Sequence, residues 1–234
     1  MDGALFQFED VGVTRSGASV LGSVNLTLPD HGVTVVVGPS GSGKSTLLRL
    51  CNRLDVATSG VVRYRGTDVV ALDPLQLRRE VGMVFQRPVV LPGTVGANLR
   101  EAAPAATDRE IDASLSRVGL PGVAERDAST LSGGESQRMC LARTLMNQPR
   151  FVLFDEPTSS LDQRAARGIE ELALALAADG IPSAWVTHDL AQMRRLAHHL
   201  AVVIGGTVAQ QGDVDAVLAE PTCAVDHFLS GGAT

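Results

Sequence analysis

Short apolar segments rich in β-branched residues alternate with longer segments of helical periodicity along most of the chain. The clearest strand patterns cover Val33–Val37, Val81–Phe85, Phe151–Phe154, Ser183–Thr187 and Ala201–Ile204. Helical patterns follow Gly43, Gly133, Asp162 and Asp189. Strands that alternate with helices in this way predict an α/β fold built on a mostly parallel sheet.

Two parts of the chain depart from this alternation. The segments "ALFQF" and "SVNLTL" near the N-terminus predict antiparallel strands joined by a turn around Ser16 and Gly17. Residues 94–146 contain no strand pattern and read as helices broken at proline and glycine. We therefore expect an antiparallel β part at the N-terminus and a helical insertion in the core.

These patterns predict one domain over residues 1–234. Its α/β core, which includes the antiparallel part, would comprise residues 1–86 and 147–234. A helical subdomain at about 87–146 would be inserted between the two halves of the core. A chain of this length can bury roughly 70% of the surface that its unfolded form exposes, so it needs no disulfide or structural metal.

Charge and composition exclude several classes of function. The net charge of −6 and the lack of any basic run longer than two arginines argue against a nucleic-acid partner. The three cysteines form no C-x-x-C pair, which is typical of buried thiols in a reducing compartment. No signal peptide is evident, and the longest apolar runs fall short of the roughly 20 residues that cross a membrane. We expect a chain that is soluble by itself.

The stretch "GPSGSGKST", residues 38–46, fits the phosphate-binding pattern G-x-x-x-x-G-K-[ST]. A predicted strand runs into it and a predicted helix leaves it, which is the context that the pattern requires. Its glycines let successive backbone N–H groups surround an anion, and the helix N-terminus adds partial positive charge. Ser45 would place its hydroxyl on Mg²⁺.

Lys44 within this stretch is the only lysine of the chain, and every other basic side chain is an arginine. A compact ammonium on a flexible stem reaches the β- and γ-phosphates of a nucleotide, where a planar guanidinium would be bulky. The bland alternative is a glycine-rich loop whose lysine is accidental. The agreement of strand, loop, helix and lysine favours the functional interpretation.

Two carboxylates, Asp155 and Glu156, end the apolar strand pattern "RFVLF". The carboxyl end of a buried strand is where open α/β sheets bind ligands. We expect Asp155 to hold Mg²⁺ and Glu156 to polarise the water that attacks the γ-phosphate. The alternative is a helix-capping pair, but Pro157 and several small polar residues separate them from the next helix.

The stretch "TLSGGESQRMCLARTL" begins a second helix with a serine and two glycines, and this N-terminus also suits a phosphate. One active site needs a single phosphate cradle. We therefore expect the second helix start to contact a nucleotide that is held by another copy of the chain. Ser132 can at the same time cap the helix, with Glu135 completing a capping box.

Together these motifs resemble those of the ATP-binding subunits of ABC transporters. Six motifs occur in the family's order: "GPSGSGKST" as Walker A, "VFQRP" as the Q-loop, "LSGGESQR" as the signature, "FVLFDEP" as Walker B, "SSLD" as the D-loop and "VTHD" as the switch. The resemblance covers nearly the whole chain and implies a P-loop fold, with ATP and Mg²⁺ bound between two chains arranged head to tail.

The resemblance also implies individual roles. Lys44, Gln86, Glu156 and His188 would be the catalytic residues, with Glu156 as the general base and His188 at the γ-phosphate. Mg²⁺ would be held by Ser45, Gln86 and Asp155. Nucleotide would contact Gly38, Ser40, Gly41, Ser42, Gly43, Lys44, Ser45 and Thr46 of one chain, and Ser132, Gly133, Gly134, Glu135 and Asp162 of the other. A capping role for the lone His188 is the alternative that the residues themselves leave open.

One position departs from the family's pattern. Members usually place an aromatic residue, which stacks on adenine, about 25 residues before Walker A, and that slot falls at or near Arg15. A guanidinium plane can stack on a base. We therefore expect Arg15 to contact the nucleotide and discrimination between ATP and GTP to be weak.

The resemblance implies ATP hydrolysis that powers solute transport through separate transmembrane permease subunits, with a solute-binding protein added if the system imports. The chain would be cytoplasmic, on the inner face of the membrane. The apolar Val89, Val90 and Leu91 either dock on the permease or pack inside the helical insertion. A soluble ABC ATPase of the repair, chromosome or translation-factor type is the alternative function, and a nucleotide-binding partner without hydrolysis is a third.

The compact length and the stretches "FQRPVVLPGTVGANL" and "WVTHDL" look most like small ATPases of phosphate import or of iron or metal export. The cargo does not follow from the residues, because the ATPase need not touch it.

Overall fold

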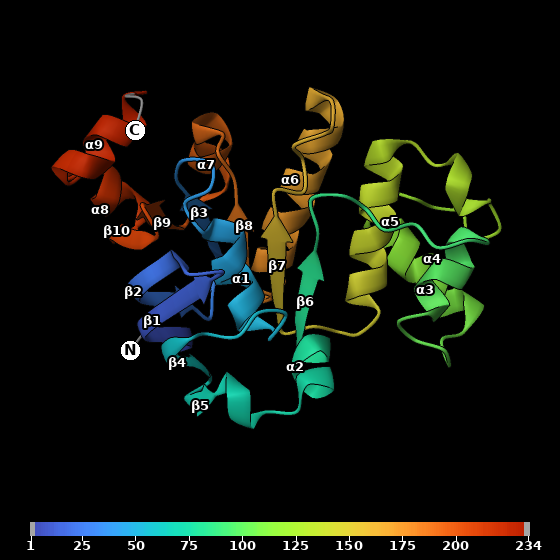
Figure 1. The fold of residues 1–234 in the computed structure, drawn as a ribbon. Coiled ribbons are helices and arrows are strands. Elements are labelled where there is room, and N and C mark those ends of the chain that lie inside the picture. Colours follow the sequence, from blue (N-terminus) through green and yellow to red (C-terminus); the bar gives the residue numbers. More distant parts are fainter. Residues whose placement is uncertain (1–2, 232–234) are drawn as a thin grey trace.

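The computed structural model describes residues 3–231, which are organised around a six-stranded sheet (Figure 1). The strand order is β10 (Thr207–Asp213), β9 (His199–Ile204), β3 (Val33–Val37), β8 (Ser183–Val186), β7 (Phe151–Asp155) and β6 (Val81–Val84). Neighbours from β9 to β6 run parallel, and β10 pairs antiparallel at one edge. The predicted parallel core is confirmed, although β9 begins at His199, ahead of the predicted start.

A second sheet of four antiparallel strands has the order β2, β1, β4, β5. It comprises β1 (Ala4–Arg15), β2 (Ala18–Pro29), β4 (Ser59–Tyr64) and β5 (Thr67–Asp68). Ser16 and Gly17 form the predicted hairpin turn and both have positive φ, 49° and 80°. The strands β4 and β5 were not predicted, although Arg65 and Gly66 form a turn of the same kind between them.

Nine α-helices occur within residues 3–231. They are α1 (Lys44–Cys51), α2 (Pro74–Glu80), α3 (Val95–Arg100), α4 (Asp108–Arg117), α5 (Gly133–Leu145), α6 (Gln163–Ala178), α7 (Leu190–Leu196), α8 (Val214–Ala219) and α9 (Cys223–Leu229), with 3₁₀ turns at Val69–Ala71 and Ala128–Thr130. Helix α2 was missed, although Asp73 caps it and Pro74 occupies its first position, which is a readable start signal.

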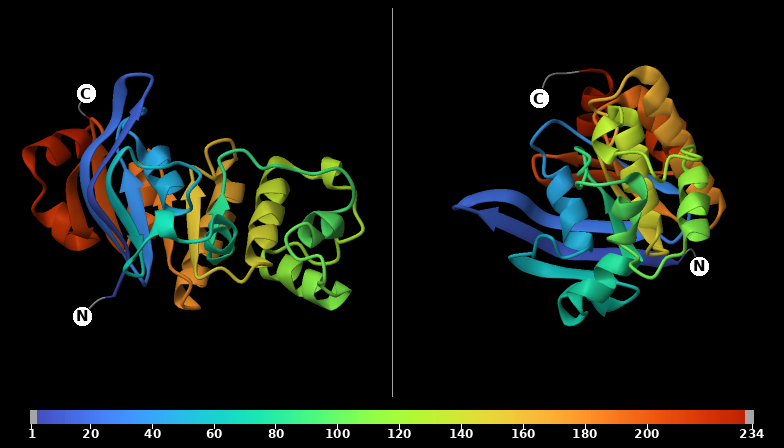
Figure 2. Two further views of the ribbon diagram at one scale, coloured as in Figure 1. Left: turned by 60° about the horizontal axis from the view of Figure 1, so that its bottom comes forward. Right: turned by 90° about the vertical axis from the view of Figure 1, so that its right-hand side faces the viewer.

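Helices α3, α4 and α5 lie together at one end of the molecule, next to β6, whereas α8 and α9 lie at the opposite end (Figures 1 and 2). The buried Asn98 fixes the loop that enters the helical part: its side chain accepts from the Leu91 N–H and donates to the Leu91 and Thr94 carbonyls. The helices between β6 and β7 therefore form a layer beside the sheet edge.

Both faces of the parallel sheet are buried, as expected of a parallel sheet covered on two sides. On β3, Val33, Val35 and Val37 point into the cluster beneath α5 and α6, while Val36 points into the cluster shared with α1 and the antiparallel sheet. Each such side chain contributes roughly 1.5–3 kcal/mol when fully buried. This packing fixes the strands, so the loops at their carboxyl ends emerge side by side and form the site.

Candidate functional site

The loop of residues 38–43 leaves β3 and leads into α1, as the sequence predicts. Gly43 precedes the helix with φ of 96°, and a Cβ there would lie 2.5 Å from Leu21 Cδ2. At Gly38 a Cβ would lie 1.9 Å from the Val203 carbonyl oxygen. Both glycines are therefore required by close approach to β2 and β9, which holds the loop against the sheet.

Lys44 lies in the mouth of this loop and is only 5% exposed. Its Nζ donates to the carbonyl oxygens of Gly38 at 2.8 Å and Pro39 at 2.7 Å. Burial lowers the pKa of Lys44, while the nearby carboxylates of Glu156 and Asp155 act in the opposite direction. The single lysine of the chain is thus enclosed by backbone, in a space shaped for an ammonium group.

Two observations test whether the loop fits a phosphate and a magnesium ion. The Ser42 hydroxyl is buried and has no hydrogen-bond partner within residues 3–231, so it is a polar group that a phosphate oxygen would satisfy. The Ser45 hydroxyl donates to Asp155 Oδ1 at 2.6 Å, which brings together two of the hard oxygen ligands that Mg²⁺ prefers. These residues fit both groups.

Glu156 follows the end of β7 with φ of 46°, in the left-handed region that side chains other than glycine rarely adopt. Its N–H donates to the Val186 carbonyl on β8, which holds the residue in this conformation. Strained backbone of this kind is concentrated at functional sites. The acid predicted to be the general base therefore has an unusual backbone conformation for a residue other than glycine.

His188 follows β8 and faces Glu156, with Nδ1 3.3 Å from Oε2. Its side chain is 66% exposed, whereas that of Glu156 is 22% exposed. The structure therefore brings the predicted base and the predicted switch histidine into one pair, with the histidine presented outward.

Gln86 is placed differently from the other predicted magnesium ligands. Its side-chain amide donates to Ser159 Oγ at 3.1 Å, so it joins the segment after Glu156 instead of the pair formed by Ser45 and Asp155. Arg49, which the sequence did not single out, lies 3.5 Å from Asp155 Oδ2. It stands one helical turn after Ser45, and this spacing is the signal that could have identified it.

The second predicted phosphate cradle begins α5. Ser132 accepts from the Glu135 N–H while the Glu135 carboxylate accepts from the Ser132 N–H, which forms the predicted capping box. The backbone N–H of Ser132 lowers the pKa of Glu135, and an ion pair with Arg126 at 2.8 Å acts in the same direction. A Cβ on Gly134 would lie 2.8 Å from Ala165 Cβ at the start of α6. The signature thus packs beside the helix that Asp162 caps.

The phosphate loop and the signature are separate sites on the chain. Among residues 3–231, the cavity at the phosphate loop, of about 240 Å³, is lined by Val20, residues 40–46 and Glu156, and the signature residues are outside it. Pockets that enclose a small molecule are larger, roughly 300–1,000 Å³. One chain therefore presents two different halves of an enclosed nucleotide site, the phosphate loop and the signature.

Comparisons with known proteins agree with this geometry. The sequence profile described as "ABC transporter" matches residues 21–159, more than half of the chain. The chain belongs to the ABC transporter family. The predicted family, fold and ATPase activity coupled to transport are thereby confirmed.

Relatives of this ABC transporter chain include ATP-binding proteins of import systems. It is 38% identical over 235 residues to "Phosphate import ATP-binding protein PstB 2" of Natronomonas pharaonis, covering 92% of this chain and 82% of that protein. It is 41% identical over 209 residues to "Protein STAR1" of Oryza sativa subsp. japonica, covering 85% of this chain. The chain spans 60% of the length of STAR1.

Among solved structures, the fold is similar to that of cbiO1 from Clostridium perfringens, which is described as part of the ABC transporter complex cbiONQ. The TM-score is 0.85 with 25% identity, and the match covers 94% of this chain and 92% of that one. Within the described residues, none of the helices of this ABC ATPase has the length and hydrophobicity that crossing a bilayer requires.

The predicted adenine contact lies at the end of β1 in this ABC ATPase. Arg15 forms an ion pair with Asp55, Nη2 to Oδ2 2.5 Å, and its side chain is 47% exposed. On the same hairpin, Val20 is the residue that lines the cavity of the phosphate loop. The stacking role of Arg15 stays a prediction. Val20 is a further residue that lines the site, and the sequence motifs did not identify it.

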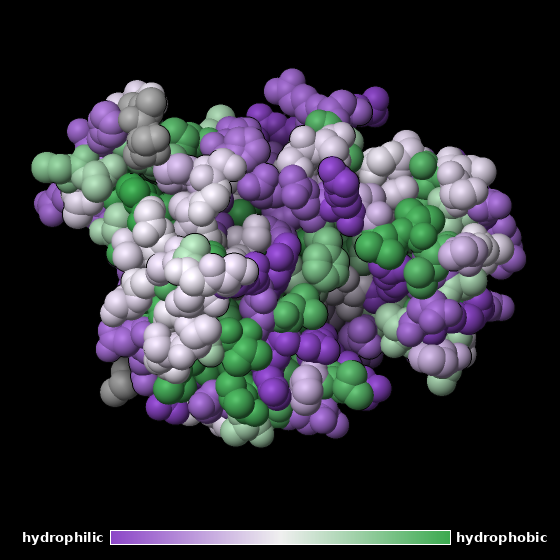
Figure 3. Space-filling model, in the orientation of Figure 1, coloured by the Kyte–Doolittle hydropathy of each residue, from purple (hydrophilic) through white to green (hydrophobic). Residues whose placement is uncertain are grey.

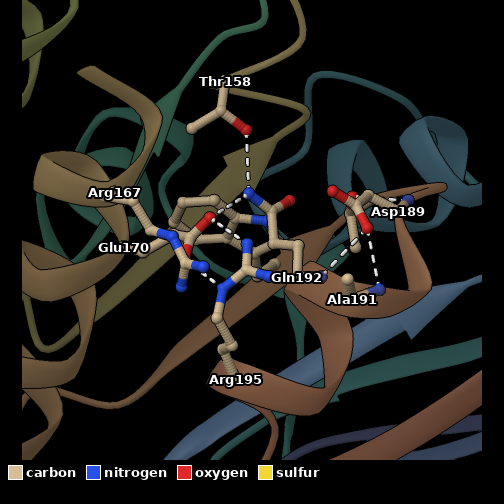
Figure 4. A network of polar contacts seen from close by, with 9 residues as sticks. Thr158, Arg167, Glu170, Asp189, Ala191, Gln192 and Arg195 are labelled. Carbon is tan, nitrogen blue, oxygen red and sulfur yellow. Dashed lines mark hydrogen bonds and ion pairs between the residues drawn. The ribbon is translucent and has the colours of Figure 1, made fainter. Parts of the chain in front are cut away.

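A polar network was also missed by the sequence motifs (Figure 4), and it borders a pocket that Glu156 and His188 line as well. Its centre is Gln192 on α7, which contacts Thr158, Trp185 and Glu170. Glu170 in turn is paired with Arg195. These residues come from separate segments of the chain and carry no local motif, so only their tertiary arrangement reveals them.

Proposed function

We propose that two copies of this chain, or this chain and a homologous subunit, bind ATP between them head to tail. The phosphate loop of one chain and the signature of the other would enclose each nucleotide. The observation that supports this arrangement is that the two cradles are both formed but the signature does not line the cavity of the phosphate loop in the same chain. In this proposal residues 1–234 act as one ATPase domain, with residues 87–146 as its helical subdomain.

Within each site the phosphate loop would hold the triphosphate through its backbone N–H groups, Lys44 and the unsatisfied Ser42 hydroxyl. Ser45, Asp155 and Gln86 would hold Mg²⁺. To reach the ion, the Gln86 side chain would have to give up its hydrogen bond to Ser159. When bound, the ion would neutralise charge on the phosphates. Ser132, Gly133, Gly134 and Glu135 would close on the partner's nucleotide, with Asp162 at the contact.

Glu156 would accept the proton of the attacking water, and His188 would contact the γ-phosphate. The pairing of these side chains, Nδ1 to Oε2 3.3 Å, supports a shared task. Because His188 is exposed, its final environment would be provided when the second chain closes on the site.

We further propose that a transmembrane permease subunit docks in the groove beside the Q-loop. This groove, of about 360 Å³, lies between the core and the helical part and includes the exposed Leu54, Phe85 and Val89. Figure 3 shows hydrophobic surface both over the region of β4, β5 and α2 and at the edge of the helical part. Such exposed apolar surface is typical of an interaction site.

The three apolar residues considered for docking divide in the structure. Val89 is 54% exposed and lines the groove together with Leu91, whereas Val90 packs partly against the hydrophobic core. A charge at Val90 would therefore disturb packing as well as docking. Val89→Glu is the better test and is expected to reduce transport by the assembled complex while leaving the ATPase activity of the isolated chain unchanged.

Docking on a permease would place the chain on the cytoplasmic face of the membrane, and a solute-binding protein would be a further partner if the system imports. Because one relative is a phosphate import ATP-binding protein, phosphate uptake is the first transport reaction to test.

Glu156→Gln tests the catalytic assignment directly. The variant is expected to bind ATP, to lose hydrolysis by at least about 100-fold and to accumulate as an ATP-dependent dimer in size-exclusion chromatography. Glu171→Gln, which removes an exposed acid of α6, is the matched control and should behave as the unmodified chain. Normal turnover by Glu156→Gln, or a monomer at saturating ATP, would overturn the proposal.

A further inference from the structure

Gln192 is a buried amide on α7 with every part of its side chain engaged (Figure 4). Its Nε2 donates to Thr158 Oγ1 at 3.0 Å and to Glu170 Oε1 at 2.9 Å, and its Oε1 accepts from Trp185 Nε1 at 3.0 Å. An indole N–H can only donate and a charged carboxylate can only accept, so these neighbours define which way the amide points. The side chain is held in a single orientation.

The segments that Gln192 joins are those that carry the two catalytic side chains. Thr158 lies two residues after Glu156, and Trp185 lies on β8, three residues before His188. Trp185 also packs on Phe154 of β7, with ring centroids 4.8 Å apart. A hydrogen bond from Glu156 N to Val186 O already connects the two segments near the strands. Gln192 adds a side-chain connection, from Trp185 within β8 to Thr158 beyond the end of β7.

Gln192 is itself held from the opposite side by an ion pair. The two nitrogens Nε and Nη2 of Arg195 donate to the two carboxylate oxygens of Glu170 at 2.8 and 2.7 Å. Arg167 adds a weaker contact with Glu170 at 3.6 Å. The Glu170 side chain is only 4% exposed, so it orders its partners in a medium where hydrogen bonds are strong.

Catalysis depends on the distance between the base and the group that contacts the γ-phosphate. A displacement of about 1 Å in such a pair can lower the rate about 100-fold. The backbone of Glu156 is held by its hydrogen bond to the Val186 carbonyl, whereas the His188 side chain is 66% exposed. The connection through Gln192 adds a constraint that links the two segments.

We propose that Gln192 is a positioning residue for ATP hydrolysis, which sets Glu156 and His188 relative to each other through its hydrogen bonds to Thr158 and Trp185. Gln192 lies outside the cavity of the phosphate loop, so it would not contact the nucleotide or the attacking water. Its effect is on the placement of the two side chains that do. This inference rests on the proposed roles of Glu156 and His188.

Thr158→Val tests this inference, because valine has the shape of threonine and removes only the oxygen that accepts the Gln192 amide. We expect kcat to fall about 10-fold while KM for ATP changes less than about twofold, since nucleotide contacts are intact. Thr158→Ser keeps the hydroxyl and should restore kcat. Thr207→Val is the matched control, with unchanged kcat, because within residues 3–231 its hydroxyl bonds to the Ile204 carbonyl alone.

Gln192→Leu and the double variant complete a thermodynamic cycle. If Thr158 and Gln192 act through one hydrogen bond, the double variant should lose no more kcat than Gln192→Leu alone. Thermal unfolding of each variant separates positioning from stability, because a merely structural residue would lower the melting temperature and leave kcat of the folded protein unchanged.

Two results would overturn the inference: Thr158→Val with the kcat of the unmodified chain, or independent losses that multiply in the double variant. These outcomes differ from failure of the proposed function. In that case the unmodified chain would not hydrolyse ATP, or Glu156→Gln would hydrolyse it normally.

Discussion

The two phosphate cradles of this chain are built in opposite ways. The phosphate loop is closed against the sheet, with Lys44 only 5% exposed and a strained Glu156 at its side. The signature is open: Ser132 and Gly133 are exposed, and the polar groups of the turn are satisfied by their own capping box. The phosphate loop thus combines an unsatisfied hydroxyl with a strained neighbour, whereas the turn that begins the signature is capped and the unsatisfied atoms of the signature, Gln137 Oε1 and Arg138 Nε, lie farther along its helix.

This difference shows how the work of a composite site is divided. Groups that are buried, charged and incompletely hydrogen-bonded are prepared for chemistry, since a ligand improves their environment. A capped helix start that is already stable on the surface offers a rigid closing face. Substitutions in the phosphate loop should therefore act on chemistry within their own chain, and those in the signature on the site of the partner.

The largest effect is expected from Lys44→Arg. The ammonium lies between two carbonyl oxygens at 2.7 and 2.8 Å, where the wider guanidinium cannot be accommodated. ATP turnover should fall at least about 100-fold and ATP-driven dimerisation should weaken. Arg100→Lys, at a partly exposed position of α3, is the control. Near-normal turnover by Lys44→Arg would mean that the loop has been misinterpreted.

The division between the cradles can be tested by mixing two inactive variants. Ser132→Asp keeps a favoured capping residue but places negative charge against the partner's phosphates, so turnover should fall about 100-fold without loss of stability. In a head-to-tail dimer of one Ser132→Asp chain and one Lys44→Arg chain, one nucleotide site carries both substitutions and the other site carries neither. An equimolar mixture should recover about a quarter of the normal ATPase rate if the chains pair at random. No recovery would indicate that each signature serves its own chain.

A smaller effect, on stability, is expected from Glu170→Gln. Burial alone would raise the pKa of Glu170, but hydrogen bonds from Arg195 and Gln192 outweigh it and hold the pKa below its usual value of 4.5. The folded pKa is lower than the unfolded one, so the stabilisation is complete above about pH 4.5 and is lost as the pH falls through the folded value.

At pH 7 the free energy of unfolding of Glu170→Gln should be about 2 kcal/mol lower than that of the unmodified chain, because Arg195 loses its charged partner. Denaturant unfolding at several pH values measures the difference, which should shrink below pH 4.5. A difference that is independent of pH would exclude the ion pair as its cause.

The smallest effect concerns the base of the nucleotide. With Arg15 near the slot that an aromatic usually fills, ATP and GTP should be hydrolysed with kcat/KM values within roughly tenfold of each other. Steady-state kinetics with both nucleotides measures this ratio. Strict preference for ATP would exclude a stacking role for Arg15 and favour contacts from elsewhere, such as Val20.

The sequence by itself determined the features that depend on short-range pattern. The strand–loop–helix around Lys44, the acids after β7 and the capped signature helix each require particular residues at fixed spacing, so they could be identified one motif at a time. Strands of the parallel core were equally visible, because burial on both faces makes them continuous apolar runs.

Tertiary structure alone decided which of these residues meet. It paired Glu156 with His188, directed Gln86 to Ser159, and kept the signature out of the cavity of the phosphate loop. It also assembled the network around Gln192 from segments up to 34 residues apart. Local spacing carries no information about such contacts, since they depend on the order of strands in the sheet and on the packing of α6 against α7.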